Sequence, residues 1–560
     1  MSTDAQPVPT SPPSPPHDHH ELGGALAGAI RVVFSFTLLS RFAGLAREVL
    51  NARVLGDTLV GSAFAAAFIV PNLFRRLFGE GALTAAFLPE YTRLTKDNPD
   101  LARRLASIVI AALTLLTGAI TLVIEGILFL SLSMGWTGSD SILSVKLTML
   151  MLPMMPLVCI TAILGGMLQA HGRFGPPAAA PIILNVFMIA GGATHFFLPD
   201  QTREGTAYWI GFAAVAASIA QIAWSLSALR GIVSWTRVWH GVGPAATTVL
   251  RRFGPVVIGL GALQLSTMID QLIAMWPVWI EPSTTRAIFG TESFPLDEAS
   301  NAILSTTTRF YQFPLGVFGL AVATAVFPLL SRTASDPAAF AHMLRRGLRI
   351  SLLIGLPASA GLLLASNDLV SVMLAGGKES YSADGIARSA AVLIGFAPAV
   401  WVYSLNNVLT RAFYSQGNTR TPMAISLISV ALNLVFNLVL IWPLREAGLA
   451  WATAASASIQ FAMLLFLCRS RLGITAIDRP TLGAAARIVL CTLVMSGAVW
   501  ATGYFLPHTD TWATHAYRLA AIVAVGMGSF ALVAFALGLP ELRWVTQKGP
   551  KGGAGAYLTE

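Results

Sequence analysis

The chain has 560 residues and is dominated by apolar runs of about 20 residues, separated by short segments rich in glycine, proline and charge. A helix of that length spans the hydrocarbon core of a bilayer and satisfies its own backbone hydrogen bonds there. The pattern predicts an all-α integral membrane protein with about 14 transmembrane helices. We expect these helices within residues 25–50, 58–78, 105–132, 147–170, 178–198, 206–229, 253–280, 302–330, 348–375, 386–412, 422–442, 448–468, 483–505 and 517–539.

Two short sequences recur about 240 residues, or six predicted helices, further along the chain. Residues 87–93 (FLPEYTR) resemble residues 327–332 (FPLLSR), and residues 168–177 (LQAHGRFGPP) resemble residues 412–422 (AFYSQGNTRTP). A repeat with an even number of spans places its two halves in parallel orientation. The repeat therefore predicts two parallel six-helix lobes and two extra C-terminal helices, with an N-lobe at 24–245, a C-lobe at 246–478 and the extra pair at 479–541.

Arginine and lysine are concentrated in every second loop between the predicted helices. Because basic loops remain on the cytoplasmic side, this alternation predicts that both termini are cytoplasmic. The even number of spans agrees. Residues 1–23 are rich in proline and polar groups and lack an apolar core, which predicts a disordered cytoplasmic tail. Residues 542–560 form a second cytoplasmic tail in this interpretation.

The composition narrows the class of protein. Hydrophobic residues make up 55% of the chain and charged residues only 11%, where soluble domains carry about 25%. The net charge of +9 reports topology in such a protein, and no basic segment suited to nucleic acid is present. The sequence lacks a glycine-rich phosphate loop, a zinc motif and a nucleophile elbow. We therefore expect a transporter rather than an enzyme. The three cysteines lie in apolar stretches at unrelated spacings, which indicates buried residues rather than disulfides or metal ligands: Cys159, Cys468 and Cys491.

The first two predicted helices contain charged residues within or at the ends of their apolar runs. Charges at membrane depth are costly, so they normally face the interior of a helix bundle or a wet cavity. Arginine stays charged when desolvated, and its planar fork binds phosphate oxygens in pairs. The cluster predicts a cavity that receives an anion such as a diphosphate. Its candidate binding residues are Ser40, Arg41, Arg47, Glu48, Arg75 and Glu80.

Two alternatives stay open at this stage. Arg47 and Glu48 also suit side chains that reach out to the membrane interface, although Arg41 lies too far inside its span for that. The pair Arg75 and Arg76 also suits a topology anchor at the cytoplasmic end of a helix.

The second half supplies one more candidate arginine and a set of oxygen-bearing residues. Arg309 has no acidic neighbour in the sequence, so an ion-pair partner must come from another helix, and Asp270 is a candidate. Asp270 also suits a cation site, because carboxylate, amide and hydroxyl oxygens are hard ligands suited to Na⁺. Hydrogen bonding between packed helices is an equally good interpretation of the amides. The candidate cation ligands are Asp270, Asn433, Asn437 and Thr453.

Three segments are similar to characteristic sequences of the MurJ/MviN family: SRFAGLAREVLNARVLG from residue 40, PNLFRRLFGEGALTAAFLPEY from residue 71 and RFYQFPLGVFGLAVATAVFPLLS from residue 309. The resemblance covers roughly residues 24–540. These are lipid II flippases of the multidrug/oligosaccharidyl-lipid/polysaccharide exporter superfamily. The resemblance implies a monomer of the bacterial cytoplasmic membrane that moves undecaprenyl-diphosphate-linked peptidoglycan precursor to the outer leaflet by alternating access.

The resemblance also implies roles for individual residues. The last two helices, 479–541, correspond to a groove for the undecaprenyl tail. The essential arginines of the family match Arg41, Arg47, Arg75 and Arg309, with Ser40 and Glu80 at matching positions. The residues around Asp270 resemble a sodium site of some members, and no other cofactor is implied. The chain departs from the family pattern where acidic residues are common, which leaves the cavity more positive: Ser62, Thr308 and Gln312.

Three rival functions remain. An exporter of another polyprenyl-linked glycan or of drugs would normally have 12 spans and lack these arginines. A membrane glycosyltransferase or phosphatase would need catalytic carboxylates or a histidine in a loop, and the outer loop 281–300 contains no evident set. A scaffold would not need buried charges. The sequence assigns no role to Glu125, an acid within the third predicted helix.

Overall fold

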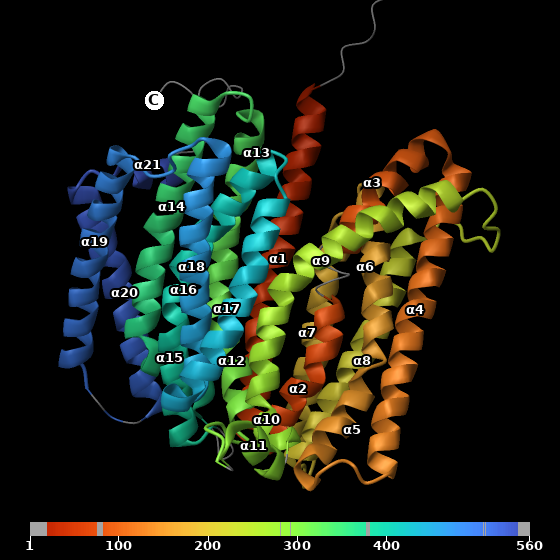
Figure 1. The fold of residues 1–560 in the computed structure, drawn as a ribbon, viewed down its shortest axis with the longest axis horizontal. Coiled ribbons are helices and arrows are strands. Elements are labelled where there is room, and N and C mark those ends of the chain that lie inside the picture. Colours follow the sequence, from red (N-terminus) through yellow and green to blue (C-terminus); the bar gives the residue numbers. More distant parts are fainter. Residues whose placement is uncertain are drawn as a thin grey trace, which may run out of the picture.

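The computed structural model describes residues 19–75, 82–280, 282–291, 293–376, 381–507, 509 and 511–546, and all of its regular elements are helices (Figure 1). Both predicted tails fall largely outside these residues. Figure 1 shows that α1 begins, and the described chain ends, at the same end of the helix bundle. We call this end the basic side, because most of the arginines that flank the helices lie there. We call the end where α1 finishes the opposite side.

The first eight helices pack mainly on one another, and in Figure 1 they extend from α1, near the middle, to α4, at the right edge. The long helix α1 runs along α7, α2 packs on α5, and α7 packs on α8. Their bounds are α1 His19–Leu55, α2 Leu59–Phe74, α3 Ala82–Asp97, α4 Pro99–Ser133, α5 Ile142–Met151, α6 Met154–Ala170, α7 Gly175–Phe197 and α8 Arg203–Leu229, with a short turn η2 at Ser139–Ser141.

The second group of helices is built around α16, which contacts α12, α14 and α18. Helix α9 connects the two groups, since it packs against α3 as well as against α12 and α17. The bounds are α9 Gly243–Ala274, α10 Trp276–Trp279, α11 Pro282–Phe289, α12 Ser300–Pro314, η3 Leu315–Gly319, α13 Leu320–Arg332, α14 Pro337–Leu364, α15 Ser366–Leu374, α16 Ala383–Ser415, α17 Arg420–Leu444 and α18 Glu446–Leu472.

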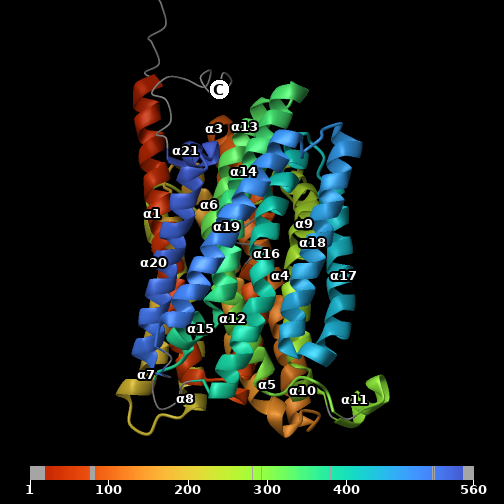
Figure 2. The ribbon, with the colours of Figure 1, turned by 90° about the vertical axis from the view of Figure 1, so that its left-hand side faces the viewer.

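The last two long helices lie on the outside of the second group, as Figure 2 shows. Helix α19 (Arg479–Phe505) packs on α14, and α20 (Trp512–Ala536) packs on α19 and α15. A short helix, α21 (Pro540–Thr546), follows and contacts α14. The predicted segment 542–560 therefore begins within a helix.

The protein is an all-helical, multi-span membrane protein, as the apolar runs predict. By length and composition, ten helical segments of the described chain can cross a membrane. The remaining predicted spans fall on α1, α2, α9 and the α12–α13 pair. Helix α1 carries arginines along its length, α2 has only 16 residues, and α12 ends after 15. The helices that depart most from a simple apolar span are thus mainly those that carry the predicted charges.

Three details differ from the sequence prediction. Helix α3, an amphipathic helix that packs on α4, α6 and α9, was not predicted. The eighth span is interrupted by the π-helical turn η3, directly after Pro314, whose missing backbone N–H cannot bond to the carbonyl four residues earlier. Part of the supposed loop 281–300 is helical, as α11.

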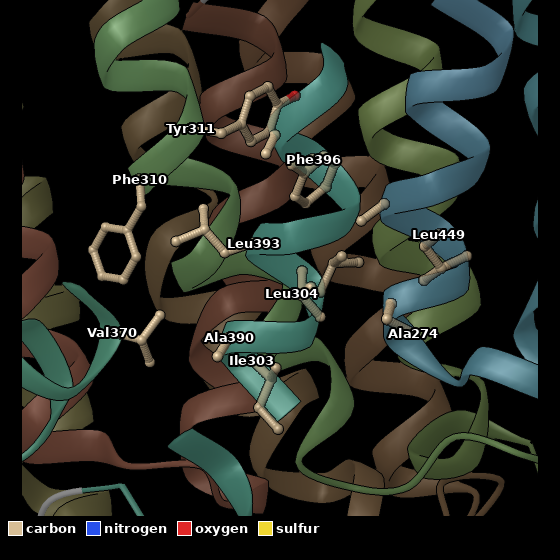
Figure 3. Packing of buried hydrophobic residues seen from close by; sticks show 14 of the residues in the cluster. Ala274, Ile303, Leu304, Phe310, Tyr311, Val370, Ala390, Leu393, Phe396 and Leu449 are labelled. Carbon is tan, nitrogen blue, oxygen red and sulfur yellow. The ribbon is translucent and has the colours of Figure 1, made fainter. Parts of the chain in front are cut away.

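Large side chains fill the centre of the second group (Figure 3). Tyr311 of α12 stacks on Phe396 of α16, with ring centroids 4.2 Å apart. Leu304 and Leu393 are fully enclosed in the same cluster. This packing holds α12 rigidly against α16, and α12 is the helix that carries Arg309.

A network of charges fastens the start of α12 on the opposite side. Arg388 of α16 bonds to Glu446 with Nε 2.5 Å from Oε1, and to Asp297 with Nη2 2.8 Å from Oδ1. Burial alone would raise the pKa of the Asp297 carboxyl, but hydrogen bonds and positive charge from Arg388, together with the charge of Arg445, hold that pKa below its ordinary value. Glu446 is only 2% exposed, so the ion pair with Arg388 has to stabilise its buried negative charge.

We expect Arg388→Ala to destabilise the protein by about 3 kcal/mol, because it leaves the buried Glu446 carboxylate without its main partner. The measurement is the midpoint of thermal unfolding in detergent. Arg471→Ala, an exposed arginine in the last turn of α18, is the control and should change the midpoint little. Equal shifts in the two variants would contradict a stabilising role for the network.

Candidate substrate and cation sites

Arg309 and Glu48 meet between the two groups of helices. Arg309 Nε lies 3.4 Å from Glu48 Oε1, and Arg309 Nη1 donates to Gln312 Oε1 at 3.4 Å. Both side chains are about four-fifths buried. The partner of Arg309 is therefore Glu48 of α1, and the suggestion that it is Asp270 is wrong. Glu48 lies more than 250 residues away in sequence, which is why only the fold reveals the pair.

Arg47 also faces the interior. Its guanidinium pairs with Glu48, its Nη1 lies 3.6 Å from Met188 Sδ, and it sits over the Phe68 ring at 5.7 Å. Its side chain is 12% exposed. An arginine that reached out to the membrane interface would not be enclosed by three helices in this way. Glu48 thus forms ion pairs with two arginines, one from each group of helices.

Arg75 and Arg41 extend the cluster on either side. Arg75 donates through Nε and Nη2 to Asn72 Oδ1, both at 3.1 Å. The charges of Arg47 and Arg75 lie within electrostatic range of Arg309. The guanidinium of Arg41 lies so close to Gly316 in the turn η3 that a Cβ at this glycine would overlap it. A side chain at position 316 would displace Arg41.

Of the other two predicted residues of this site, Ser40 and Glu80, the structure describes only Ser40. The backbone carbonyl of Ser40 accepts a hydrogen bond from Asn185 Nδ2 at 3.1 Å. Glu80, and Arg76 of the suggested topology anchor, lie outside the described residues. The structure therefore brings together Arg47, Glu48 and Arg309, with Arg75 nearby and Arg41 beside the π-helical turn.

A cavity lies between α1, α2, α9 and α12, and the Arg309–Glu48 pair is part of its wall. Tyr381 also lines the cavity, and its hydroxyl donates to the carbonyl of Ala302 at 3.2 Å. Other polar lining residues are Asn51, Asn72, Gln271 and Ser305.

Below this cavity, hydrogen bonds between the two groups of helices close the opposite side. Ser62 Oγ accepts from the backbone N–H of Ala302 at 3.0 Å, and Asn301 Nδ2 donates to the Ser62 carbonyl at 3.0 Å. The carboxylate of Asp57 accepts from the Ser382 N–H at 3.0 Å and from the Ser382 hydroxyl. We call this set of five residues the latch: Asp57, Ser62, Asn301, Ala302 and Ser382.

Arg53 reinforces the same closure. Its Nε donates to the Met373 carbonyl at 2.9 Å and its Nη2 to the Val372 carbonyl at 2.6 Å. Sequence reasoning missed Arg53 and Asp57, because polar residues at the end of a span resemble ordinary loop residues. Ser62 was noted only as a missing carboxylate, whereas in the fold its oxygens bridge α2 and α12.

The four predicted cation ligands converge within the second group of helices. Asn437 Nδ2 donates to Asp270 Oδ1 at 2.6 Å, and Thr453 Oγ1 lies 3.4 Å from Asp270 Oδ2. Asn433 Oδ1 accepts from Asn437 Nδ2 at 3.3 Å and from Ser266 Oγ at 2.9 Å. All four residues are at least 90% buried.

The donor atoms of this site suit a hard monovalent cation. Asn437 Oδ1 is buried without a hydrogen-bond partner, so one ligand oxygen is available beside an ionisable carboxylate. Within the described residues, no group of three or more His, Cys, Asp or Glu residues could hold a metal ion. The oxygens from carboxylate, amide and hydroxyl groups therefore fit Na⁺ better than a transition metal. Gln271 and Thr308 line this site and also a second, smaller pocket that is lined by Arg309.

The chain is similar to known proteins over most of its length. The probable lipid II flippase MurJ of Vibrio cholerae is 26% identical over 543 residues, covering 92% of this chain and 97% of the relative. The corresponding protein of Rhizobium meliloti is 29% identical over 540 residues, covering 94% and 96%.

Solved structures have the same fold. A structure described as lipid II flippase MurJ in an inward closed conformation has a TM-score of 0.72 at 21% identity, covering 90% of this chain and 98% of that chain. An inward-facing multidrug resistance MATE family transporter of the MOP superfamily has a TM-score of 0.62 at 13% identity, covering 80% and 98%.

The family model described as "Lipid II flippase MurJ" matches residues 51–522, which is most of the chain and runs from the end of α1 into α20. The family consists of transporters, in agreement with the lack of enzyme motifs. The chain belongs to the lipid II flippase MurJ family.

Proposed function

We propose that this protein moves lipid II, the undecaprenyl-diphosphate-linked disaccharide peptide, from the inner to the outer leaflet of the bacterial cytoplasmic membrane by alternating access. The observation that carries this assignment is the Arg309–Glu48 pair, which joins the two groups of helices at the wall of the cavity, with Arg47 paired to the same carboxylate. The same family membership makes drug export a weaker alternative.

In this proposal the arginines bind the diphosphate of the substrate. Arg309, Arg47 and Arg75 offer planar forks from both groups of helices, and such forks bind phosphate oxygens in pairs. While the cavity is empty, the Glu48 carboxylate neutralises part of the positive charge of Arg47 and Arg309. An arriving diphosphate would compete with Glu48 for these guanidinium groups, so binding would loosen a contact between the two groups of helices.

The direction of transport follows from the orientation. We assign the basic side to the cytoplasm, because arginine-rich loops stay on that side. The latch then closes the periplasmic side, and it must break for release. An inside-negative potential acts on the emptied cationic cavity with about 2.3 kcal/mol per elementary charge per 100 mV, which favours its return inward.

The remaining parts of the substrate and the coupling ion have separate places. We assign the undecaprenyl tail to α19 and α20, whose outer faces carry exposed apolar side chains such as Leu493 and Met527. Na⁺ would be held by Asp270, Asn433, Asn437 and Thr453, where it would supply positive charge beside the carboxylate. Because Gln271 and Thr308 line both the cation site and the small pocket beside Arg309, Na⁺ binding would affect the position of α12, the helix that carries Arg309.

The test of this function is depletion of the protein in a host that has no other lipid II flippase. Lipid II accessible at the outer leaflet should fall, and expression of the wild-type chain should restore it. An outer-leaflet level that stays unchanged on depletion would refute the assignment.

We expect Asp57→Ala to open the periplasmic side more often, because it removes both hydrogen bonds from Ser382 to the other group of helices. A cysteine introduced at Ser305, which lines the cavity, should then react faster with a membrane-impermeant maleimide added from outside. The native cysteines are buried and contribute little background. Asp384→Ala is the control, since Asp384 contacts Arg388 within its own helix. Equal labelling rates would show that the latch does not limit access.

A further inference from the structure

We propose that the groove between α4 and α9 binds one anionic glycerophospholipid of the surrounding membrane. The groove has a volume of about 250 Å³ and is lined by apolar side chains, among them Ile108, Ala112 and Leu116 of α4 and Ala246, Leu250 and Phe253 of α9. Leu116 and Leu250 are more than half exposed, so the groove opens outward. This site goes beyond the proposed transport function and does not depend on it.

An arginine stands at the basic end of the groove. Arg104, Ile108 and Ala112 follow one another at four-residue spacing and share one stripe of α4. Arg104 Nη1 donates to the His240 carbonyl at 3.0 Å, which holds the guanidinium at the rim. Within the described residues this is the one hydrogen bond of the Arg104 side chain, so its other N–H groups can bind a phosphate oxygen.

The segment 230–242 marks the level of the membrane surface at this rim. It is fixed to α4, because Arg103 Nη1 donates to Ser234 Oγ and Ser107 Oγ accepts from the Thr236 N–H, both at 3.1 Å. Its tryptophans, Trp235 and Trp239, are about half exposed. Tryptophan is enriched where the bilayer meets water, so the head groups lie at the height of Arg104.

The charge around the rim selects the head group. The segment 230–242 contains Arg230, Arg237 and His240 and lacks an acidic residue. The nearby Asp100 is paired with Arg103 at 2.9 Å. A phosphate with net negative charge matches this surface, and basic pockets at the ends of transmembrane helices bind anionic lipids in this way. A peptide would leave its backbone polar groups unsatisfied in the apolar groove.

The test uses the full-length protein in detergent with phosphatidylglycerol or phosphatidylcholine of identical acyl chains. A ligand of the folded state raises the unfolding midpoint, so phosphatidylglycerol should raise it more and at lower concentration. Arg104→Gln should weaken the apparent affinity for phosphatidylglycerol about 10-fold, to the level of phosphatidylcholine. Arg251→Gln is the control, since Arg251 lies on a different face of α9 and should leave the preference intact.

Two results would overturn the proposal. Equal stabilisation of the wild type by the two lipids would mean that lipid acts only as a surrounding solvent, and an unchanged preference in Arg104→Gln would remove the head-group site. Ala112→Phe and Ala246→Phe fill the groove from either helix and should abolish the phosphatidylglycerol effect. In case these variants fold poorly, a photoreactive phosphatidylglycerol should label residues 108–116 and 246–253 of the wild type, and labelling elsewhere alone would contradict the site.

Discussion

Arg309→Ala is expected to abolish lipid II transport and growth in the depletion host, with the protein still present in the membrane. The side chain is largely enclosed, and its ion pair with Glu48 joins the two groups of helices. Removing an arginine that binds a charged ligand in an enclosed site typically costs 2–5 kcal/mol, which corresponds to roughly 30-fold or more in affinity. The measurements are complementation and the amount of lipid II accessible at the outer leaflet.

Two further variants separate the role of the guanidinium fork from that of charge. Arg309→Lys keeps the charge but loses the paired donors, so it should retain only part of the activity. Arg332→Ala removes an exposed arginine at the end of α13 and should complement fully. Wild-type growth of Arg309→Ala would return this residue to a purely structural role. Normal growth of Arg41→Ala would do the same for the arginine beside Gly316.

Asp270→Asn is expected to abolish any stimulation of transport by Na⁺. Asparagine has nearly the same size as aspartate, and its oxygen can still accept from Asn437, so the packing of α9 against α17 should survive. The negative charge that attracts the cation is lost, however, and the site lies too deep for solvent to replace it. The measurement is the rate of transport in vesicles with Na⁺ or with choline.

The matched control for this experiment is Glu125→Gln, which neutralises another acid within a transmembrane helix, α4, far from the cation ligands in the chain. It should leave the response to Na⁺ as in the wild type. If transport by the wild type is the same in Na⁺ and choline, or if Asp270→Asn keeps a full Na⁺ response, the cation proposal is wrong.

Much of the helical architecture was predictable, because the bilayer imposes a simple requirement. Each span must be long and apolar and must form its backbone hydrogen bonds internally, so the local composition of the sequence is enough to predict the helices. The same logic missed α3, whose amphipathic sequence packs on other helices without crossing, and the interruption at η3. Both depend on neighbours that a hydropathy pattern does not report.

The site was predictable in its residue types and less so in its pairings. Asp270, Asn433, Asn437 and Thr453 were grouped correctly because intramembrane polar residues seek one another. The predicted ion-pair partner of Arg309 was wrong, because Asp270 was the only acid considered for it, whereas the actual partner, Glu48, lies in the first helix. Ser62 and Asp57 carried no sequence signal for a contact between the two groups of helices.

The sequence by itself determined the membrane class, the helical spans, the family resemblance and the presence of costly buried charges. Each of these depends on residues that are neighbours in the chain. The tertiary structure alone decided that Glu48 serves both Arg47 and Arg309, that the latch closes the opposite side, and that α4 and α9 leave a groove with Arg104 at its rim. These features join residues that are distant in sequence, so the contacts that stabilise them form only when the helices pack together.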